Sequence, residues 1–459
     1  MKTYNSNRRE FIKSISKGLL GGAALTNGLV PLLANAETTA ASQYKALVCI
    51  NLEGGNDAFN MLVPSSNSGY AAYSKARSNI AIAREALLPL SPTNSTLENY
   101  GLNPVLADIA HLFSQEKIAL LGNIGNLIEP VTKANYFDKK AKLPPHLFSH
   151  KDQTEYLQAL NNGNLSTGWA GRIAEAMASS NINQQLAMNI TLSGDNSFQR
   201  GNAVLPYSVR NTGVNLIDAF SEQNPNDFSA SRAQLYRSFL NRKRDHLLQS
   251  YYSDIQLNAW SMAQYVSDIL QAQPPLNLPL MNNSSPQGLT ESLAMIAKLI
   301  AANEAFQVKR QIFYINLGPF DTHRNQLENQ TPLLTELNNG LRDFFQALTA
   351  MGLADQVTCF TTAEFGRTLT MNGTDGTDHG WTSHHLVMGG AVKGNQIIGR
   401  MPVLDTGSDD DIGEGRFIPT LSFDQYAATL SEWFGVSTDD IDAIFPNVKN
   451  FDQRNIGFV

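Results

Sequence analysis

The fold is decided by residues 45–57, KALVCINLEGGND, an apolar run that breaks at two glycines and ends in an aspartate. The segment Lys45–Leu52 is short, apolar and rich in β-branched residues, which is typical of a buried strand. Gly54 and Gly55 predict a tight turn directly after it. Those glycines serve either a simple chain reversal or the close approach of Asp57 and nearby backbone to a ligand.

The same pattern of short apolar runs and amphipathic segments continues along the chain. Runs of strand length are predicted as further strands at residues 117–123, 186–192, 311–317, 356–361 and 385–388. Helical spacing or helix-start signals predict helices at residues 104–115, 151–160, 168–178, 332–351 and 423–434. Strands that alternate with helices predict an α/β fold with a mostly parallel sheet.

One region interrupts that alternation. Residues 195–290 are predicted as a helical insertion, because 228–271 is largely helical in pattern and 271–287 is rich in proline and asparagine. No internal repeat is present, so residues 37–459 are expected to form a single domain.

The first 36 residues have the pattern of an export signal. Arg8 and Arg9 precede an apolar stretch at 18–33 and an Ala-Asn-Ala sequence at 34–36. This resembles a twin-arginine signal, which predicts export through the twin-arginine machinery to the bacterial periplasm or beyond. An amphipathic helix or a membrane anchor is the alternative. No other stretch is apolar for 18 residues, so no stable membrane span is expected in the mature chain.

Charge and cysteine content exclude several classes of protein. The 459 residues include 34 basic and 41 acidic side chains, a net charge of −7, which argues against a nucleic-acid partner. Two cysteines, Cys49 and Cys359, cannot form a disulfide framework or a cysteine-based zinc site.

Carboxylates and imidazoles follow several of the predicted strands. Asp57 follows the first, Asp321 and His323 follow 311–317, and Glu364 follows 356–361; farther on lie Asp378, His379, His384 and His385. Because ligands bind beyond the carboxyl ends of the strands in open α/β sheets, we expect a divalent metal site there. Oxygen and imidazole ligands without thiolate suit Zn²⁺, Mn²⁺, Mg²⁺ or Ca²⁺. Polar loops without a metal are the alternative.

Three further segments allow two interpretations each. Ser149 is either the N-cap of the helix that follows it or a nucleophile at a helix N-terminus. Arg367 either grips a substrate anion or pairs with Glu364. The acidic stretch 405–414 is a solvated loop or a calcium site without EF-hand spacing.

Long ordered motifs resemble an exported bacterial family known as domain of unknown function 1501. They include LEGGNDAFNMLVP from residue 52, FSHKDQTEYLQ from 148, GPFDTH from 318, AEFGRTL from 363 and NGTDGTDHGW from 372. That family is distantly similar to the alkaline phosphatase and sulfatase superfamily. The resemblance implies a three-layer α/β/α fold with a one-metal or two-metal centre.

Within that superfamily, Asp57 matches a metal-binding Asp, and Asp321 with His323 matches an Asp/His ligand pair. Glu364 falls where an Asp-His pair is usual, but Phe365 follows it and cannot bind a metal. Asp378 and His379 then replace that pair, with His384 or His385 as a late ligand. The formylglycine motif of common sulfatases, C/S-x-P-x-R, is absent at Cys49, Cys359 and Ser149.

The function expected from these features is metal-dependent hydrolysis of phosphate or sulfate esters, in small anionic molecules or polysaccharides. Ser149 or a water would be the nucleophile. Two alternatives remain: a non-catalytic binding or assembly protein on the same fold, and a metal-dependent hydrolase of another ester bond.

Overall fold

The computed structural model describes residues 43–94, 99–161, 165–214, 228–242, 246–274 and 288–459. The predicted signal peptide at 1–36 and most of the proline-rich loop at 271–287 lie outside these residues. Within them, no helix is both long enough and apolar enough to cross a bilayer.

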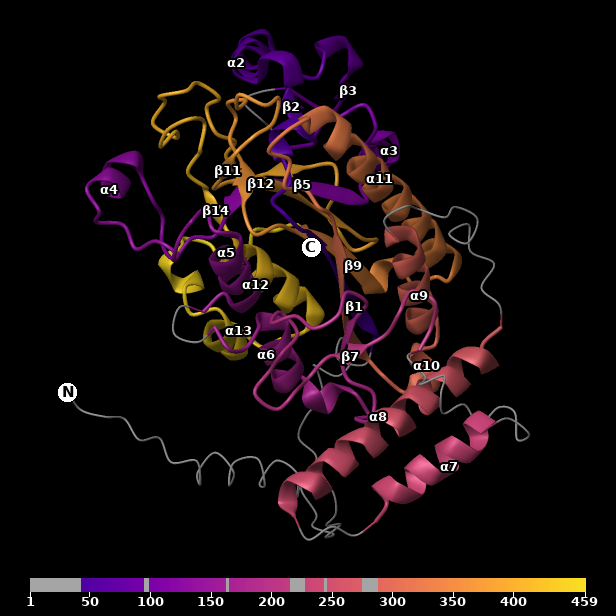
Figure 1. Ribbon diagram of the computed structural model, residues 1–459. Coiled ribbons are helices and arrows are strands. Elements are labelled where there is room, and N and C mark those ends of the chain that lie inside the picture. Colours follow the sequence, from indigo (N-terminus) through magenta and orange to yellow (C-terminus); the bar gives the residue numbers. More distant parts are fainter. Residues whose placement is uncertain (1–42, 95–98, 162–164, 215–227, 243–245, 275–287) are drawn as a thin grey trace, which may run out of the picture. The chain divides into compact units, whose positions relative to one another are not determined.

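A nine-stranded sheet forms the centre of the fold (Figure 1). Eight strands follow the order β13 (Ile397–Ile398), β5 (Ile118–Gly125), β12 (Ser383–Met388), β9 (Val357–Thr362), β1 (Lys45–Leu52), β8 (Arg310–Leu317), β6 (Asn189–Thr191) and β7 (Tyr207–Ser208). The ninth, β14 (Leu421–Ser422), pairs with β5. All the pairings are parallel except the two made by β12, which runs against both β5 and β9.

The side chains of β1 alternate between two hydrophobic cores. Val48 and Ile50 belong to one core, whereas Leu47 and Cys49 belong to the other. Because successive side chains of a strand point to opposite faces, helices must cover the sheet on both sides. The fold is therefore a three-layer α/β/α arrangement.

Different helices supply the two outer layers (Figure 1). The core that contains Val48 is closed by α3 (Ala107–Ser114), α9 (Leu289–Ala301) and α11 (Gln326–Ala350). The opposite core is closed by α5 (His150–Ala159), α6 (Trp169–Ala176), α12 (Phe423–Phe434) and α13 (Thr438–Ile444).

Smaller elements complete the described chain. A three-stranded sheet joins β2 (Leu62–Pro64), β4 (Tyr100–Leu102) and β3 (Leu88–Pro89), and β10 (Gly366–Arg367) pairs with β11 (His379–Gly380). The remaining α-helices are α2 (Asn67–Arg77), α4 (Lys133–Phe137), α7 (Phe228–Leu240), α8 (Leu247–Ala272) and α10 (Asn303–Phe306). Helices α7 and α8 occupy the region predicted as an insertion.

Candidate metal centre

Five segments meet at the edge of the sheet where the parallel strands have their carboxyl ends. The turn after β1 contains Gly54, the loop after β8 carries Asp321 and His323, and the loop after β9 carries Glu364. Because β12 runs in the opposite direction, the segment that leads into it brings His379 to the same edge. His150, the first residue of α5, completes the group.

Gly54 allows the first two of these segments to approach closely. Its φ is +104°, and a Cβ at this position would lie 2.6 Å from the backbone nitrogen of Asp321. A larger residue would therefore meet both backbone strain and a clash. The turn also donates the Gly54 N–H to Glu364 Oε1 at 2.9 Å.

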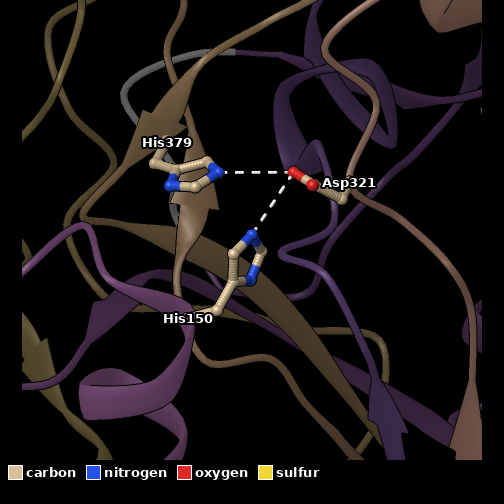
Figure 2. Close-up of side chains that lie close together, drawn as sticks. All are labelled: His150, Asp321 and His379. Atoms are coloured by element: carbon tan, nitrogen blue, oxygen red, sulfur yellow. Dashed lines mark hydrogen bonds and ion pairs between the residues drawn. The ribbon is translucent and has the colours of Figure 1, made fainter.

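Three imidazoles converge on one oxygen of Asp321. The Nε2 atoms of His150, His323 and His379 lie 3.5, 3.1 and 3.3 Å from Asp321 Oδ1. Figure 2 shows the His150 and His379 rings pointing toward this carboxylate. Potential ligand atoms of His150, Asp321 and His379 all lie within 4.8 Å of one another.

The other ring nitrogen of each histidine contacts an oxygen that can only accept. His150 Nδ1 lies 2.9 Å from Glu364 Oε1, His323 Nδ1 lies 3.0 Å from Asp378 Oδ1, and His379 Nδ1 lies 2.7 Å from the Phe148 carbonyl. Each Nδ1 therefore carries the proton, so the Nε2 of a neutral ring presents its lone pair.

This arrangement suits a cation. His323 Nε2 and His379 Nε2 are only 2.9 Å apart, so two lone pairs face each other unless a proton or a metal ion lies between them. Carboxylates and carbonyls that hold the Nδ1 atoms of metal ligands are a usual feature of protein metal sites. His150, Asp321 and His379, with His323 beside them, can therefore hold a divalent metal.

The profile of one family, described as a protein of unknown function (DUF1501), matches residues 44–414. The chain belongs to this family. No curated protein matches it.

Two solved structures are distantly similar to this DUF1501 chain. The first is Ps i-CgsB in complex with k-i-k-neocarrahexaose, with a TM-score of 0.37 and 11% identity over 89% of this chain and 77% of that one. The second is the lipoteichoic acid synthase LtaP from Listeria monocytogenes, with a TM-score of 0.27 and 8% identity over 73% of this chain and 60% of that one. Likenesses this distant do not assign a function.

The histidine–aspartate cluster of this DUF1501 protein opens into a cavity of about 600 Å³. His150, Asp321 and Glu364 form part of its wall. Glu364 thus faces the same cavity as Asp321, as expected for a residue that orients a ligand. Its carboxylate is buried and connects the β1 turn to the His150 ring.

The ionisation of the cluster follows from its contacts. Burial alone would raise the pKa of Asp321. Arg367 and the neighbouring imidazoles have the larger, opposite effect and hold this pKa below its ordinary value, so Asp321 is a carboxylate at neutral pH. The hydrogen bond to Glu364 raises the pKa of His150, whereas burial lowers that of His379.

Arg367 does not have the substrate-binding role considered for it. Its side chain is fully buried, and it donates to the carbonyls of Gly54, Gly55 and Thr377 and pairs with Asp321. Because its N–H groups already donate to protein acceptors, Arg367 holds Asp321 and the β1 turn in place. The alternative considered for it, a pair with Glu364, is not formed either.

Asp57 is not brought together with the cluster. Its two carboxylate oxygens accept from the Arg77 guanidinium at 2.6 Å each, and both side chains are fully buried. The assignment as a metal ligand is corrected here, because this bidentate ion pair occupies the carboxylate.

His384 and His385 also lie away from the cluster, inside β12 and completely buried. His384 Nδ1 accepts from the backbone N–H of Asn123, and His385 contacts Thr361 and the rings of Phe423 and Tyr426. Burial lowers the pKa of His384 to about 4 and that of His385 to about 3. Both are neutral core residues, which corrects their assignment as late ligands.

Ser149 and the acidic stretch have structural contacts. Ser149 is the N-cap of α5, and its hydroxyl lies 2.5 Å from Asp152 Oδ2. In the acidic stretch, Asp411 accepts from the backbone N–H groups of three glycines, and Asp410 pairs with Arg400. These contacts favour the capping and loop interpretations.

His150 is a candidate ligand that was not predicted from the sequence. It follows no predicted strand, and candidate ligands were sought only after predicted strands. Its place in the ordered motif FSHKD, next to an N-cap, was the available signal. A helix that begins at the ligand edge brings its first residue there as effectively as a strand end does.

Proposed function

We propose that the chain is an exported, metal-dependent hydrolase of phosphate or sulfate esters. The observation that carries the proposal is the convergence of the His150, His323 and His379 Nε2 atoms on Asp321 Oδ1. Among Zn²⁺, Mn²⁺, Mg²⁺ and Ca²⁺, imidazole nitrogens favour Zn²⁺. When bound, such an ion supplies Lewis acidity at an ester oxygen.

The surrounding residues keep the ligands in place before substrate arrives. Glu364, Asp378 and the Phe148 carbonyl fix the orientation of the three rings. Arg367 holds Asp321 from the buried side. Such support raises the basicity of the histidines and limits their movement.

The cavity offers features that suit an anionic ester group. Lys151 lines it next to His150, at the N-terminus of α5. The positive end of a helix dipole and an ammonium group both favour a phosphate or sulfate, whether on a small molecule or on a polysaccharide. Because the Ser149 hydroxyl is hydrogen-bonded to Asp152, we favour water as the nucleophile.

A second candidate is hydrolysis of an ester in a neutral substrate, such as a carbohydrate ester. The observation in its favour is the charge of the cavity wall, where Glu53 and Glu155 accompany the cluster carboxylates, while Asp195 is paired with Arg200. Carboxylates repel an anionic substrate but accept hydrogen bonds from hydroxyl groups.

Metal analysis and a substrate panel test the proposal on the purified mature protein. Wild type should hold about one zinc or another divalent ion per chain, detected by mass spectrometry, and should hydrolyse phosphate or sulfate esters. The double variant His150→Ala/His379→Ala should lose both the metal and the activity. His111→Ala is the matched control, because His111 is exposed on α3.

Each outcome distinguishes the candidates. Metal with activity only on uncharged esters would favour the second candidate. Metal without any hydrolysis would favour a binding or assembly protein. Equal metal content in wild type and the double variant would overturn the assignment of the site itself.

The export part of the proposal rests on Arg8 and Arg9. Replacing both with lysine should leave the precursor in the cytoplasm, because the twin-arginine machinery reads this pair. Immunoblots of cytoplasmic and periplasmic fractions measure the outcome. If the variant reached the periplasm to the same extent as wild type, the twin-arginine assignment would be contradicted.

A further inference from the structure

Helix α7 exposes an apolar stripe to solvent. Phe228, Leu235 and Phe239 are 75%, 68% and 45% exposed, respectively, and Arg232 and Arg242 are exposed too. Phe228, Arg232, Leu235 and Phe239 are separated by four, three and four residues, which places them on one side of the helix, and Arg242 follows two residues after the helix ends. The buried side chains Ala230, Ala233 and Leu240 hold the helix in place.

The first turns of α8 expose a second stripe. It consists of Leu247, Leu248, Tyr251, Tyr252 and Ile255, all at least 44% exposed. Side chains at i, i+1, i+4, i+5 and i+8 share one helix face. Most of the large hydrophobic side chains exposed in the described chain belong to this patch, which we name the hairpin patch and which comprises the exposed stripes of α7 and α8.

The hairpin patch is basic in an acidic protein. The described residues 228–242 and 246–255 contain three arginines and one aspartate, whereas the whole chain has a net charge of −7. Arg232 lies among the apolar side chains of α7, and Arg242 lies just beyond the end of this helix. The Arg232 guanidinium also lies over the Phe228 ring, 5.1 Å from its centroid.

From this combination we infer that the hairpin patch docks on the surface of an anionic lipid bilayer. A helix with leucine and aromatic residues next to arginines lies in the headgroup region, where the apolar side chains reach the acyl chains and the guanidinium groups meet lipid phosphates. Tyrosines favour the same interface. The inference does not depend on the metal site.

A second copy of the chain is a less suitable occupant. In a two-fold symmetric interface both copies contribute the same patch, so Arg232 and Arg242 of each copy would be brought into one interface. Like charges brought together in a desolvated interface are destabilising. Lipid phosphates meet the arginines without that repulsion.

Vesicle sedimentation with the full mature chain tests the inference. Wild type should co-sediment with vesicles containing phosphatidylglycerol, and much less with pure phosphatidylcholine. Raising the salt concentration should weaken the binding. Arg232→Gln/Arg242→Gln should lower the partition coefficient about 30-fold, and Leu247→Ser/Leu248→Ser about 10- to 100-fold.

Matched controls change the same chemistry elsewhere on the surface. Lys139→Gln/Lys140→Gln removes two exposed charges, and Ile182→Ser/Leu205→Ser removes two exposed apolar side chains; both should bind as wild type does. Metal content should be unchanged in all four variants.

Absence of wild-type binding, or equal binding to both kinds of vesicle, would overturn the inference. So would a dimer, detected by light scattering, that the Leu247→Ser/Leu248→Ser variant abolishes. The lipid and salt comparisons use wild type alone, so they decide the question even if a variant fails to fold.

Discussion

At the scale of single residues, Arg367 connects the cluster around Asp321 to the core. Its guanidinium is fully buried, and the carbonyls of Gly54, Gly55 and Thr377 and the carboxylate of Asp321 accept its hydrogen bonds. A buried cation with this many acceptors stabilises a particular arrangement of the chain, because each acceptor would lack a partner without it.

Arg367→Met should therefore act on stability. We expect a loss of about 3 kcal/mol in the free energy of unfolding, since buried carbonyls would be left without donors. Urea unfolding of the purified variant measures this loss. If the variant had normal stability but bound substrate more weakly, the result would instead support anion binding by Arg367.

Glu364 gives a second prediction, because one of its oxygens accepts from both Gly54 and His150. Glu364→Ala removes the acceptor that fixes the His150 ring, so metal affinity should fall about 10- to 100-fold. Glu364→Gln keeps an acceptor oxygen and should retain more of the affinity. Competition with a chelator measures both variants, and equal affinity in all three proteins would contradict the orienting role.

The candidate site was predictable where a side chain directly follows a buried strand. Asp321 and Glu364 illustrate this. A continuous apolar run predicts a buried strand, and the residues that directly follow parallel strands lie at the same edge of the sheet. Asp57 also follows a strand but turns toward Arg77, and no sequence pattern links those two residues. Tertiary packing determines which polar side chains form pairs.

At the scale of elements, the reversed strand β12 explains two errors at once. His384 and His385 were expected near the metal because they come soon after Asp378 and His379 in the chain, where the next strand was predicted to begin only at residue 385. In the antiparallel strand the ligand edge lies before Ser383, next to His379. His384 and His385 then fall inside the sheet, where burial keeps them neutral.

Their burial predicts an acid-sensitive stability. Above pH 6.5 both rings are neutral whether the chain is folded or unfolded. Below it, the unfolded rings take up protons, but the folded rings do not until about pH 4 and pH 3. Stability is therefore lost as pH falls from about 6.5, by about 1.4 kcal/mol per pH unit for each ring.

The comparison of wild type with His384→Gln/His385→Gln isolates this contribution. Burial also raises the pKa of Asp424 to about 7, which acts in the opposite direction over the same range. That effect is common to both proteins and cancels in the difference. Urea unfolding at intervals from pH 7 to pH 4.5 should give a flatter profile for the variant, and parallel profiles would contradict the prediction.

Element boundaries were predictable when the elements were long and buried. Strand β1 has the predicted bounds, and α12 begins directly after its cap Ser422. By contrast, α11 starts at Gln326 and continues through Pro332, although proline removes one backbone hydrogen bond there. Strands of two or three residues, such as β10 and β11, exist only through their pairing partner, so local sequence does not indicate them.

At the scale of the whole molecule, alternating strands and helices were sufficient for the α/β class. The two-sided core follows from strands that contain several apolar residues in succession, because such strands need cover on both faces. Strand order was not predictable, since it depends on which connections cross the sheet. The cluster thus depends on the complete fold: β1, β8, β9, β12 and α5 must all be in place before its ligands meet.

That dependence predicts that metal stabilises the folded chain. An ion that binds only the folded state adds about 2.7 kcal/mol at a concentration 100 times its Kd. After treatment with a chelator, the melting temperature of wild type should rise steadily as zinc is added back. The melting temperature of His111→Ala should rise in the same way. His150→Ala/His379→Ala should show no such rise, because its ligands are gone. An equal rise in that variant would mean that the ion binds elsewhere, and the cluster around Asp321 would then be a network of hydrogen bonds without a metal.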